Sequence, residues 1–157
     1  MFDPVQYMQQ LHGGLKTTKD DYYFARVSGV SDLEEVLDKF KRNTRFFAID
    51  DAQDGITFRG AGAGYFERRQ YTVYLLGRAK YGDMDQRAEI LTEAKTIFRS
   101  ILSKLIKDKL TIPVLSAEQI RFFEVPPAFA FGTAGLYFIF TVENPVNLVY
   151  NAAEWEA

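Results

Sequence analysis

The sequence contains no cysteine, and His12 is the only histidine among its 157 residues. Without cysteine there can be no disulfide, no thiolate metal ligand and no cysteine nucleophile, which fits a reducing compartment. A zinc site needs several clustered ligands, and a Ser-His-Asp triad would need His12 as its base. We interpret His12 as a structural residue near the end of a helix, and we expect neither a metal nor a cofactor.

Net charge and long apolar runs are also scarce. The formal net charge is -2, and the lysines and arginines form no basic block, so sequence recognition of nucleic acid is not expected. No apolar run approaches the ~20 residues needed to span a bilayer. The first residues, MFDPVQYMQQLHGG, lack the basic and apolar regions of a signal peptide. These features predict a cytoplasmic protein that does not enter a membrane.

Aromatic residues are abundant, with 14 phenylalanines and 9 tyrosines. Hydrophobic residues make up 47% of the chain, and a chain of this length buries roughly 70% of the surface that its unfolded form exposes. We therefore expect one domain over residues 1–157 with a substantial core. The aromatic side chains have to be packed either inside that core or against another molecule.

Periodicity and turn signals predict an α+β fold in the order helix, strand, helix, three strands, helix, two strands. We expect a mixed or mostly antiparallel sheet of about five to six strands, packed with one long and two shorter helices. The predicted helices are 4–14, 30–43 and 84–107. The predicted strands are 20–27, 45–50, 55–59, 65–76, 119–125 and 135–143.

Capping residues set the expected helix starts. Asp3 precedes a proline and is suited to cap free amides. Ser31 with Glu34, and Asp83 with Gln86, have the spacing of a capping box. These residues should therefore cap the first turns of the three helices.

Glycine-containing turns indicate how the strands pair. Asp54-Gly55 is a dipeptide typical of hairpin turns, so strands 45–50 and 55–59 are predicted to pair with each other. The glycines between 60 and 64 should then connect 55–59 to the long strand 65–76 as a second hairpin. Because nearly every residue from 71 to 76 is apolar, aromatic or β-branched, this strand is expected to be central and covered on both faces.

Three motifs contain residue types that could form a chemical site. The stretch DDAQDG at 50–55 fails as a calcium loop because Ala52 and Ala61 stand at ligand positions, so it is interpreted as a polar turn. The glycines of RGAGAGYF precede a strand rather than a helix, which disfavours phosphate binding and leaves a flexible hairpin or a loop that orders against a partner. The acidic pair Glu34 and Glu35 cannot face each other on a helix. No enzymatic activity is expected.

The aromatic surplus allows two interpretations. Either helices cover both faces of the sheet in a monomer, or one face keeps an apolar area that another molecule covers. The loop at 126–135, PPAFAFGTAG, adds Phe129 and Phe131, which either lie under the sheet edge or contact a partner.

In its order of elements the chain resembles small phage or prophage tail proteins of the tail-terminator family, also described as tail-completion or minor tail proteins. The resemblance extends from YFERRQYTVYLLGRAKYGDMDQRAEIL through TEAKTIFRSIL to the final NPVNLVYNAAEW. It implies a non-enzymatic virion assembly protein that forms rings, typically of six subunits, and contacts tail-tube and head-connector proteins. It would act in the bacterial cytoplasm during assembly and remain in the virion.

Under this hypothesis the candidate interface residues flank the two glycine-containing loops. They are Gly60, Gly62, Gly64, Tyr65, Phe66, Arg68, Arg69, Phe129 and Phe131. The main alternative is a monomeric cytosolic domain that binds a partner protein, or a small apolar ligand between sheet and helices. An enzyme that uses carboxylates and tyrosines is a third.

Overall fold

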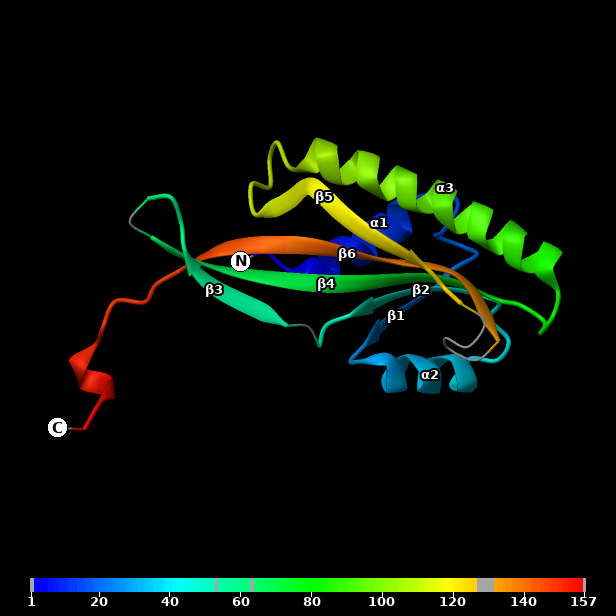
Figure 1. Cartoon of the computed structure of the whole chain (residues 1–157), viewed down its shortest axis with the longest axis horizontal. Coiled ribbons are helices and arrows are strands. Elements are labelled where there is room, and N and C mark those ends of the chain that lie inside the picture. The colour runs from blue at the N-terminus through cyan, green and yellow to red at the C-terminus, as the bar shows by residue number, and fades with distance from the viewer. Residues whose placement is uncertain (1, 53, 63, 127–131, 157) are drawn as a thin grey trace.

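The computed structural model describes residues 2–52, 54–62, 64–126 and 132–156. Within these residues six strands form one mixed sheet that packs with three α-helices (Figure 1). The elements are α1 (Pro4–Gly14), β1 (Tyr23–Val27), α2 (Val30–Lys39), β2 (Arg45–Asp50), β3 (Gly55–Arg59), β4 (Tyr65–Arg78), α3 (Met84–Asp108), β5 (Leu115–Glu124), β6 (Thr133–Val146) and the 3-10 helix η1 (Ala152–Glu154). This confirms the predicted α+β class and order of elements.

The sheet is organised around β4 and β6, which are each 14 residues long. They pair antiparallel along their whole length, from Tyr65 opposite Val146 to Arg78 opposite Thr133. The strand order is β1-β2-β4-β6-β5, and β3 also pairs with β4. Only the β1–β2 pair is parallel among the described strands. The central position predicted for β4 is confirmed.

The predicted pairing of β2 with β3 is wrong. β2 pairs with the second half of β4, where Asp50 lies opposite Thr72, and β3 pairs with the first half, where Gly55 lies opposite Arg69. Because β4 is long enough to hold both partners on one side, the Asp-Gly dipeptide connects two successive partners of β4 instead of closing a hairpin. The β3–β4 hairpin is confirmed, with Phe58 opposite Phe66.

Helices cover both faces of one part of the sheet, with α3 and α2 on opposite sides (Figure 1). On one face, α1 and α3 pack over a buried cluster that includes Phe47 and Phe138. On the other face, Leu37 of α2 packs in a cluster with Phe46. These two clusters take up much of the aromatic surplus. We call the helix-covered part of the molecule the body.

Two of the three predicted helix caps are confirmed. The Asp3 carboxylate accepts hydrogen bonds from the amides of Val5 and Gln6 at 3.0 and 3.2 Å, and Asp83 accepts one from the amide of Gln86 at 3.0 Å. The cap predicted at Ser31 is wrong, because no side chain among the described residues caps the first turn of α2. Helix α2 begins at Val30 after Gly29, which has a φ of 89° that favours glycine.

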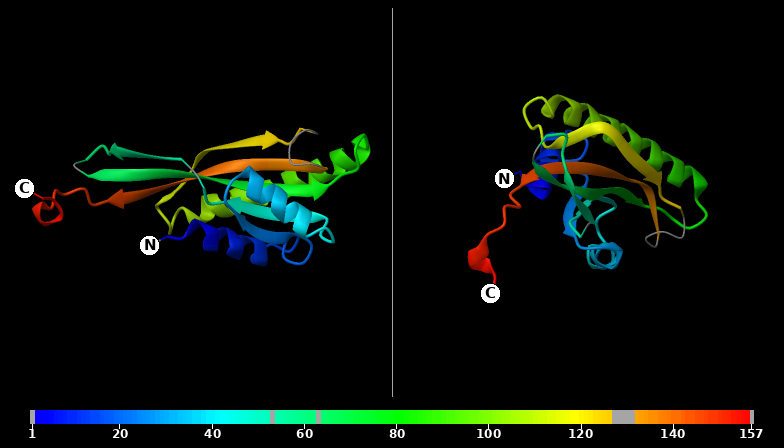
Figure 2. Two further views of the ribbon diagram at one scale, coloured as in Figure 1. Left: turned by 90° about the horizontal axis from the view of Figure 1, so that it is seen from below. Right: turned by 60° about the vertical axis from the view of Figure 1, so that its left-hand side comes forward.

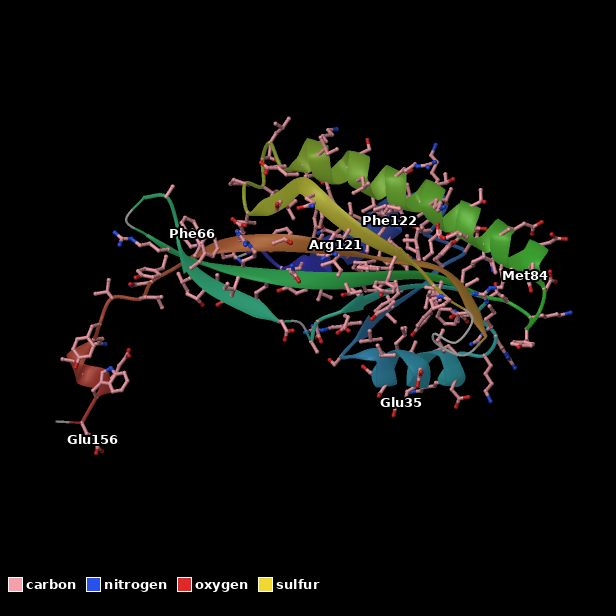
Figure 3. All side chains as sticks on the ribbon, viewed as in Figure 1. Glu35, Phe66, Met84, Arg121, Phe122 and Glu156 are labelled. Atoms are coloured by element: carbon pink, nitrogen blue, oxygen red, sulfur yellow. The ribbon has the colours of Figure 1, made fainter. Side chains whose placement is uncertain are left out.

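The long helix α3 is amphipathic. Its buried residues are Ile90, Ala94, Ile97, Phe98, Ile101 and Leu105. Met84 in the first turn and Ile106 near the last turn are exposed, and Met84 lies at the far end of the helix in Figure 3. Within the described part of the chain, neither α3 nor any other helix combines the length and apolar character of a membrane span.

Candidate functional site

One end of the sheet extends past the helices. It consists of β3, residues 65–70 of β4 and residues 141–146 of β6, and we call it the tip. The left view in Figure 2 shows the tip as a narrow extension of the body, with residues 147–156 continuing beyond it. Tip side chains are mostly exposed or half-buried, whereas β4 becomes fully buried from Tyr71 to Gly77. Residues 60–62 and 64 of the predicted loop lie at the end of the tip.

The glycines of this loop differ in the space that each would leave for a side chain. The amide of Gly60 donates a hydrogen bond to the carbonyl of Gly64 at 2.9 Å. A Cβ at Gly60 would lie 2.4 Å from Cε2 of Phe66, so the aromatic ring excludes any larger residue in this arrangement. A Cβ at Gly62 or Gly64 would meet nothing within 4 Å. Gly60 therefore has a structural role, while the other two leave the loop surface open.

Phe66 and Arg68 lie together on the α2 side of the tip. The Phe66 ring stacks on Phe58 with a centroid distance of 5.9 Å and an interplanar angle of 25°. The guanidinium of Arg68 lies 4.6 Å from the Phe58 centroid, and its Nε donates to Oε1 of Glu143 at 2.8 Å. These contacts make a half-buried cluster of two rings and one ion pair.

Tyr65 and Arg69 lie on the opposite face of the tip because side chains alternate along β4. Tyr65 is 43% exposed, and the guanidinium of Arg69 lies 5.3 Å from the centroid of Tyr71. The predicted candidates from the first loop are therefore divided between two faces. The other two candidates, Phe129 and Phe131, lie outside the described residues.

The most exposed apolar segment is one that the sequence analysis did not select. Residues 147–156, which we call the arm, leave the end of β6 and point away from the body (Figures 1 and 2). Leu148, Val149, Tyr150 and Trp155 are 55%, 82%, 72% and 67% exposed. Such a group of large apolar residues on one segment is typical of an interaction surface. The only signal in the sequence was the close spacing of these residues after β6.

Local hydrogen bonds order the arm. The Asn151 carboxamide oxygen accepts from the amide of Ala153 at 3.1 Å, and its Nδ2 donates to Glu154 at 3.2 Å. These bonds hold η1, and they place the rings of Tyr150 and Trp155 side by side, with centroids 6.4 Å apart and an angle of 26°. The arm thus presents a preformed aromatic pair.

A groove of about 360 Å³ lies between α1 and α3. Its apolar lining includes Leu11, Leu15 and Ile101, and two exposed lysines, Lys104 and Lys107, stand beside them. Lys104 donates to Oδ1 of Asp108 at 2.8 Å. The remaining lining residues are small or polar: Gln10, Gly14, Ser100 and Ser103. The groove is therefore apolar inside, with Lys107 and the Asp108-paired Lys104 along one side.

Asp108 connects the two helices near this groove. The hydroxyl of Tyr7 donates to its Oδ2 at 2.9 Å. Burial, followed by this hydrogen bond to a carboxylate, raises the pKa of Tyr7. Burial alone would raise the pKa of Asp108, but the hydrogen bonds from Lys104 and Tyr7 outweigh it and the pKa is lowered. The pairing fixes α1 against the end of α3 and thereby holds the groove in shape.

A second groove, of about 350 Å³, lies on the face of the sheet that α2 covers in part, and residues of β4, β5 and β6 line it. Charged residues line it, including Arg68, Glu143, Glu118 and Arg121, together with polar residues of β4 and β6. Arg68 is already paired with Glu143. Among the described residues, no three His, Asp or Glu side chains gather closely enough to hold a metal ion.

The acidic stretch at 50–55 stabilises a loop. Asp50 is buried and accepts hydrogen bonds from the amides of Gly29 and Ala52 at 3.0 and 2.9 Å. Asp51 accepts from the Ser28 hydroxyl at 2.6 Å and from Arg26 Nε at 2.5 Å. The hydrogen bond from Ser28, with that from Arg26, lowers the pKa of Asp51. The carboxylates thus join the ends of β1 and β2 to the start of α2.

His12 also has a structural position. It lies in the last turn of α1, as predicted, but is half-buried. Its Nε2 donates to the carbonyl of Tyr22 at 2.5 Å, and its ring packs 5.5 Å from those of Phe24 and Phe47. The imidazole therefore packs the end of α1 against the sheet and hydrogen-bonds to the chain just before β1.

Comparisons with known proteins give no independent assignment of the site: no protein-family model matches the sequence, and no curated protein is significantly similar to it.

Proposed function

We propose that this protein is a non-enzymatic phage tail assembly protein of the tail-terminator type. In this function, copies associate into a ring at the junction between tail and head connector. The protein works through contacts with itself, the tail tube and the connector, in the host cytoplasm during assembly and then in the virion. The observation that carries the proposal is the arm, whose Leu148, Val149, Tyr150 and Trp155 project from the far end of the tip.

Exposed apolar area of this kind favours association in water. Burying apolar surface contributes about 25 cal/mol per Å², and tyrosine and tryptophan are enriched among the residues that dominate binding energy at interfaces. The tip adds exposed and half-buried aromatic and cationic residues, among them Tyr65, Phe66 and Arg69. Open glycines at 62 and 64 leave the end of the tip accessible to a partner. These surfaces suit an assembly protein better than an isolated domain.

The oligomeric state tests the proposal directly. We expect multi-angle light scattering and native mass spectrometry to find a closed oligomer at micromolar concentrations, and negative-stain electron microscopy to show rings. Addition of tail-tube protein from the same phage or prophage should give a capped tube end. A mass that stays monomeric at every concentration, with no binding to tubes, would overturn the proposal.

The groove between α1 and α3 favours a second candidate, the monomeric ligand-binding domain. Its volume of about 360 Å³ is near the lower end of the range for small-molecule pockets, roughly 300–1,000 Å³. It lies between two helices and has an aliphatic lining that includes Leu11 and Leu15, whereas the predicted ligand site lies between the sheet and the helices. A monomer that retains a small apolar molecule in native mass spectrometry would favour this candidate over the assembly protein.

A further inference from the structure

We propose that the arm of one copy binds in the groove between α1 and α3 of a neighbouring copy. This inference rests on the self-association proposed above and names the two surfaces that meet. In this contact the aromatic pair of Tyr150 and Trp155 lies in the apolar part of the groove. The carboxylates of the arm lie near the lysines at the margin of the groove.

The arm has the properties of an inserted segment. Its aromatic pair is ordered by the Asn151 hydrogen bonds before any partner is met. Less conformational entropy is therefore lost on binding than a flexible peptide would lose. Buried aromatic side chains cover about 150–250 Å² each, so two of them supply roughly half of the ~800 Å² that each partner contributes to a standard interface. Leu148 and Val149 extend the same surface.

The groove is complementary to the arm in chemistry. Leu11, Leu15 and Ile101 offer an apolar lining to the rings. Lys107 stands on the exposed side of the groove beside Lys104, which is paired with Asp108, and the arm carries Glu154 and Glu156 on either side of Trp155. Opposite charges at the margin of an interface steer encounter and fix the register of binding.

The direction of the arm favours a neighbouring copy over its own chain. Figures 1 and 2 show the arm beyond the tip, pointing away from α1 and α3, and Glu156 lies at its far end in Figure 3. Because arm and groove are different surfaces, the contact between copies is head-to-tail. Such contacts close into a ring when the rotation between neighbours permits, or two copies can exchange arms as a dimer.

Because the chain contains no cysteine, any disulfide can form only between cysteines introduced by substitution. Ser103 lines the groove and Ala153 lies in the arm, and both are exposed. We expect Ser103→Cys protein, mixed with tagged Ala153→Cys protein and oxidised, to give a reducible cross-linked pair containing one chain of each kind. The matched control is Ser31→Cys, which is exposed on α2 at the opposite face of the sheet. Mixed with the same arm variant, it should give little of this product.

Trp155 provides an independent readout because it is the only tryptophan in the chain. As protein concentration rises through the association range, its fluorescence should shift to the blue as the ring leaves water. Lys107→Glu should weaken self-association by about tenfold or more and keep the emission red at concentrations where the unmodified protein has shifted. Circular dichroism should stay unchanged, since Lys107 is exposed on α3.

The outcomes separate this inference from the proposed function. A ring that forms with Trp155 still exposed and no mixed disulfide would overturn the arm–groove contact and leave the assembly function standing. If Ser103→Cys and Ala153→Cys form a disulfide only when both are in the same chain, the contact between copies would also be overturned. An arm-exchanged dimer would support the contact but contradict the ring, and a strict monomer would contradict both.

Discussion

The body and the tip are built on the same two strands but use them differently. In the body, β4 and β6 are covered by helices on both faces, and their side chains are almost all buried. In the tip, the same strands continue without a helix, and their rings and charges remain partly exposed. The comparison indicates that stability resides in the body, whereas the tip and arm are available for contacts with other molecules.

The largest expected effect comes from truncating a core phenylalanine. Phe138 is fully buried, and its ring centroid lies 4.9 Å from that of Phe98. We expect Phe138→Ala to lower the free energy of unfolding by about 3–5 kcal/mol in urea titrations. The control is Phe66→Ala in the tip, where the half-buried stack on Phe58 should contribute only about 0.5–1.5 kcal/mol. Equal losses at both sites would contradict the division between body and tip.

A glycine in the body gives the next largest effect. Gly135 has a φ of 125°, and a Cβ there would lie 2.1 Å from the Leu75 carbonyl oxygen. We expect Gly135→Ala to cost about 3 kcal/mol, because backbone strain and overpacking each cost about 1–3 kcal/mol. Gly64→Ala, where a Cβ has open space, should change the free energy of unfolding by less than about 0.5 kcal/mol. The same urea titration measures both variants.

Substitutions in the arm should weaken self-association while leaving the free energy of unfolding nearly unchanged. Trp155→Ala is expected to change the free energy of unfolding, measured under monomeric conditions, by less than about 0.5 kcal/mol. It should weaken self-association by about tenfold or more in analytical ultracentrifugation. Trp155→Phe should restore much of the association because an aromatic ring is kept. A destabilised monomer with unchanged association would show that Trp155 belongs to the body.

The smallest effect concerns pH. Because the folded-state pKa of Asp51 is lowered by Ser28 and then Arg26, its contribution to stability is present above the unfolded pKa. It is lost as pH falls through the lower folded pKa. Asp51→Asn should therefore reduce the urea midpoint at pH 7 by less than the core variants do. The loss should shrink when the unfolding curves are measured below pH 4, and a loss that is constant with pH would contradict this role.

The sequence predicted features that depend on local chemistry. The caps at Asp3 and Asp83 and the β3–β4 hairpin each need only a few neighbouring residues, and each is confirmed. The partner of β2 could not be predicted in this way, because it depends on the length of β4 and on residues far along the chain. The cap of α2 also depends on distant residues, since the Gly29 amide bonds to Asp50.

The candidate site was harder to predict than the fold. Tyr65, Phe66, Arg68 and Arg69 were selected together because they adjoin a glycine loop, but alternation along the strand divides them between two faces. The arm was missed because an apolar segment with no helix or strand period gives no sign of whether its own domain will cover it. Only the three-dimensional path of the chain reveals its exposure.

The length of the β4–β6 ladder has a mechanical consequence. A neighbouring copy that bound the arm would pull β6 along the direction of the strand. The fourteen residue pairs between β4 and β6 would then resist this force together in shear, instead of separating one at a time. The arm would therefore be anchored in the two central strands of the sheet, so that tension at the margin of an assembly is carried into the centre of each subunit.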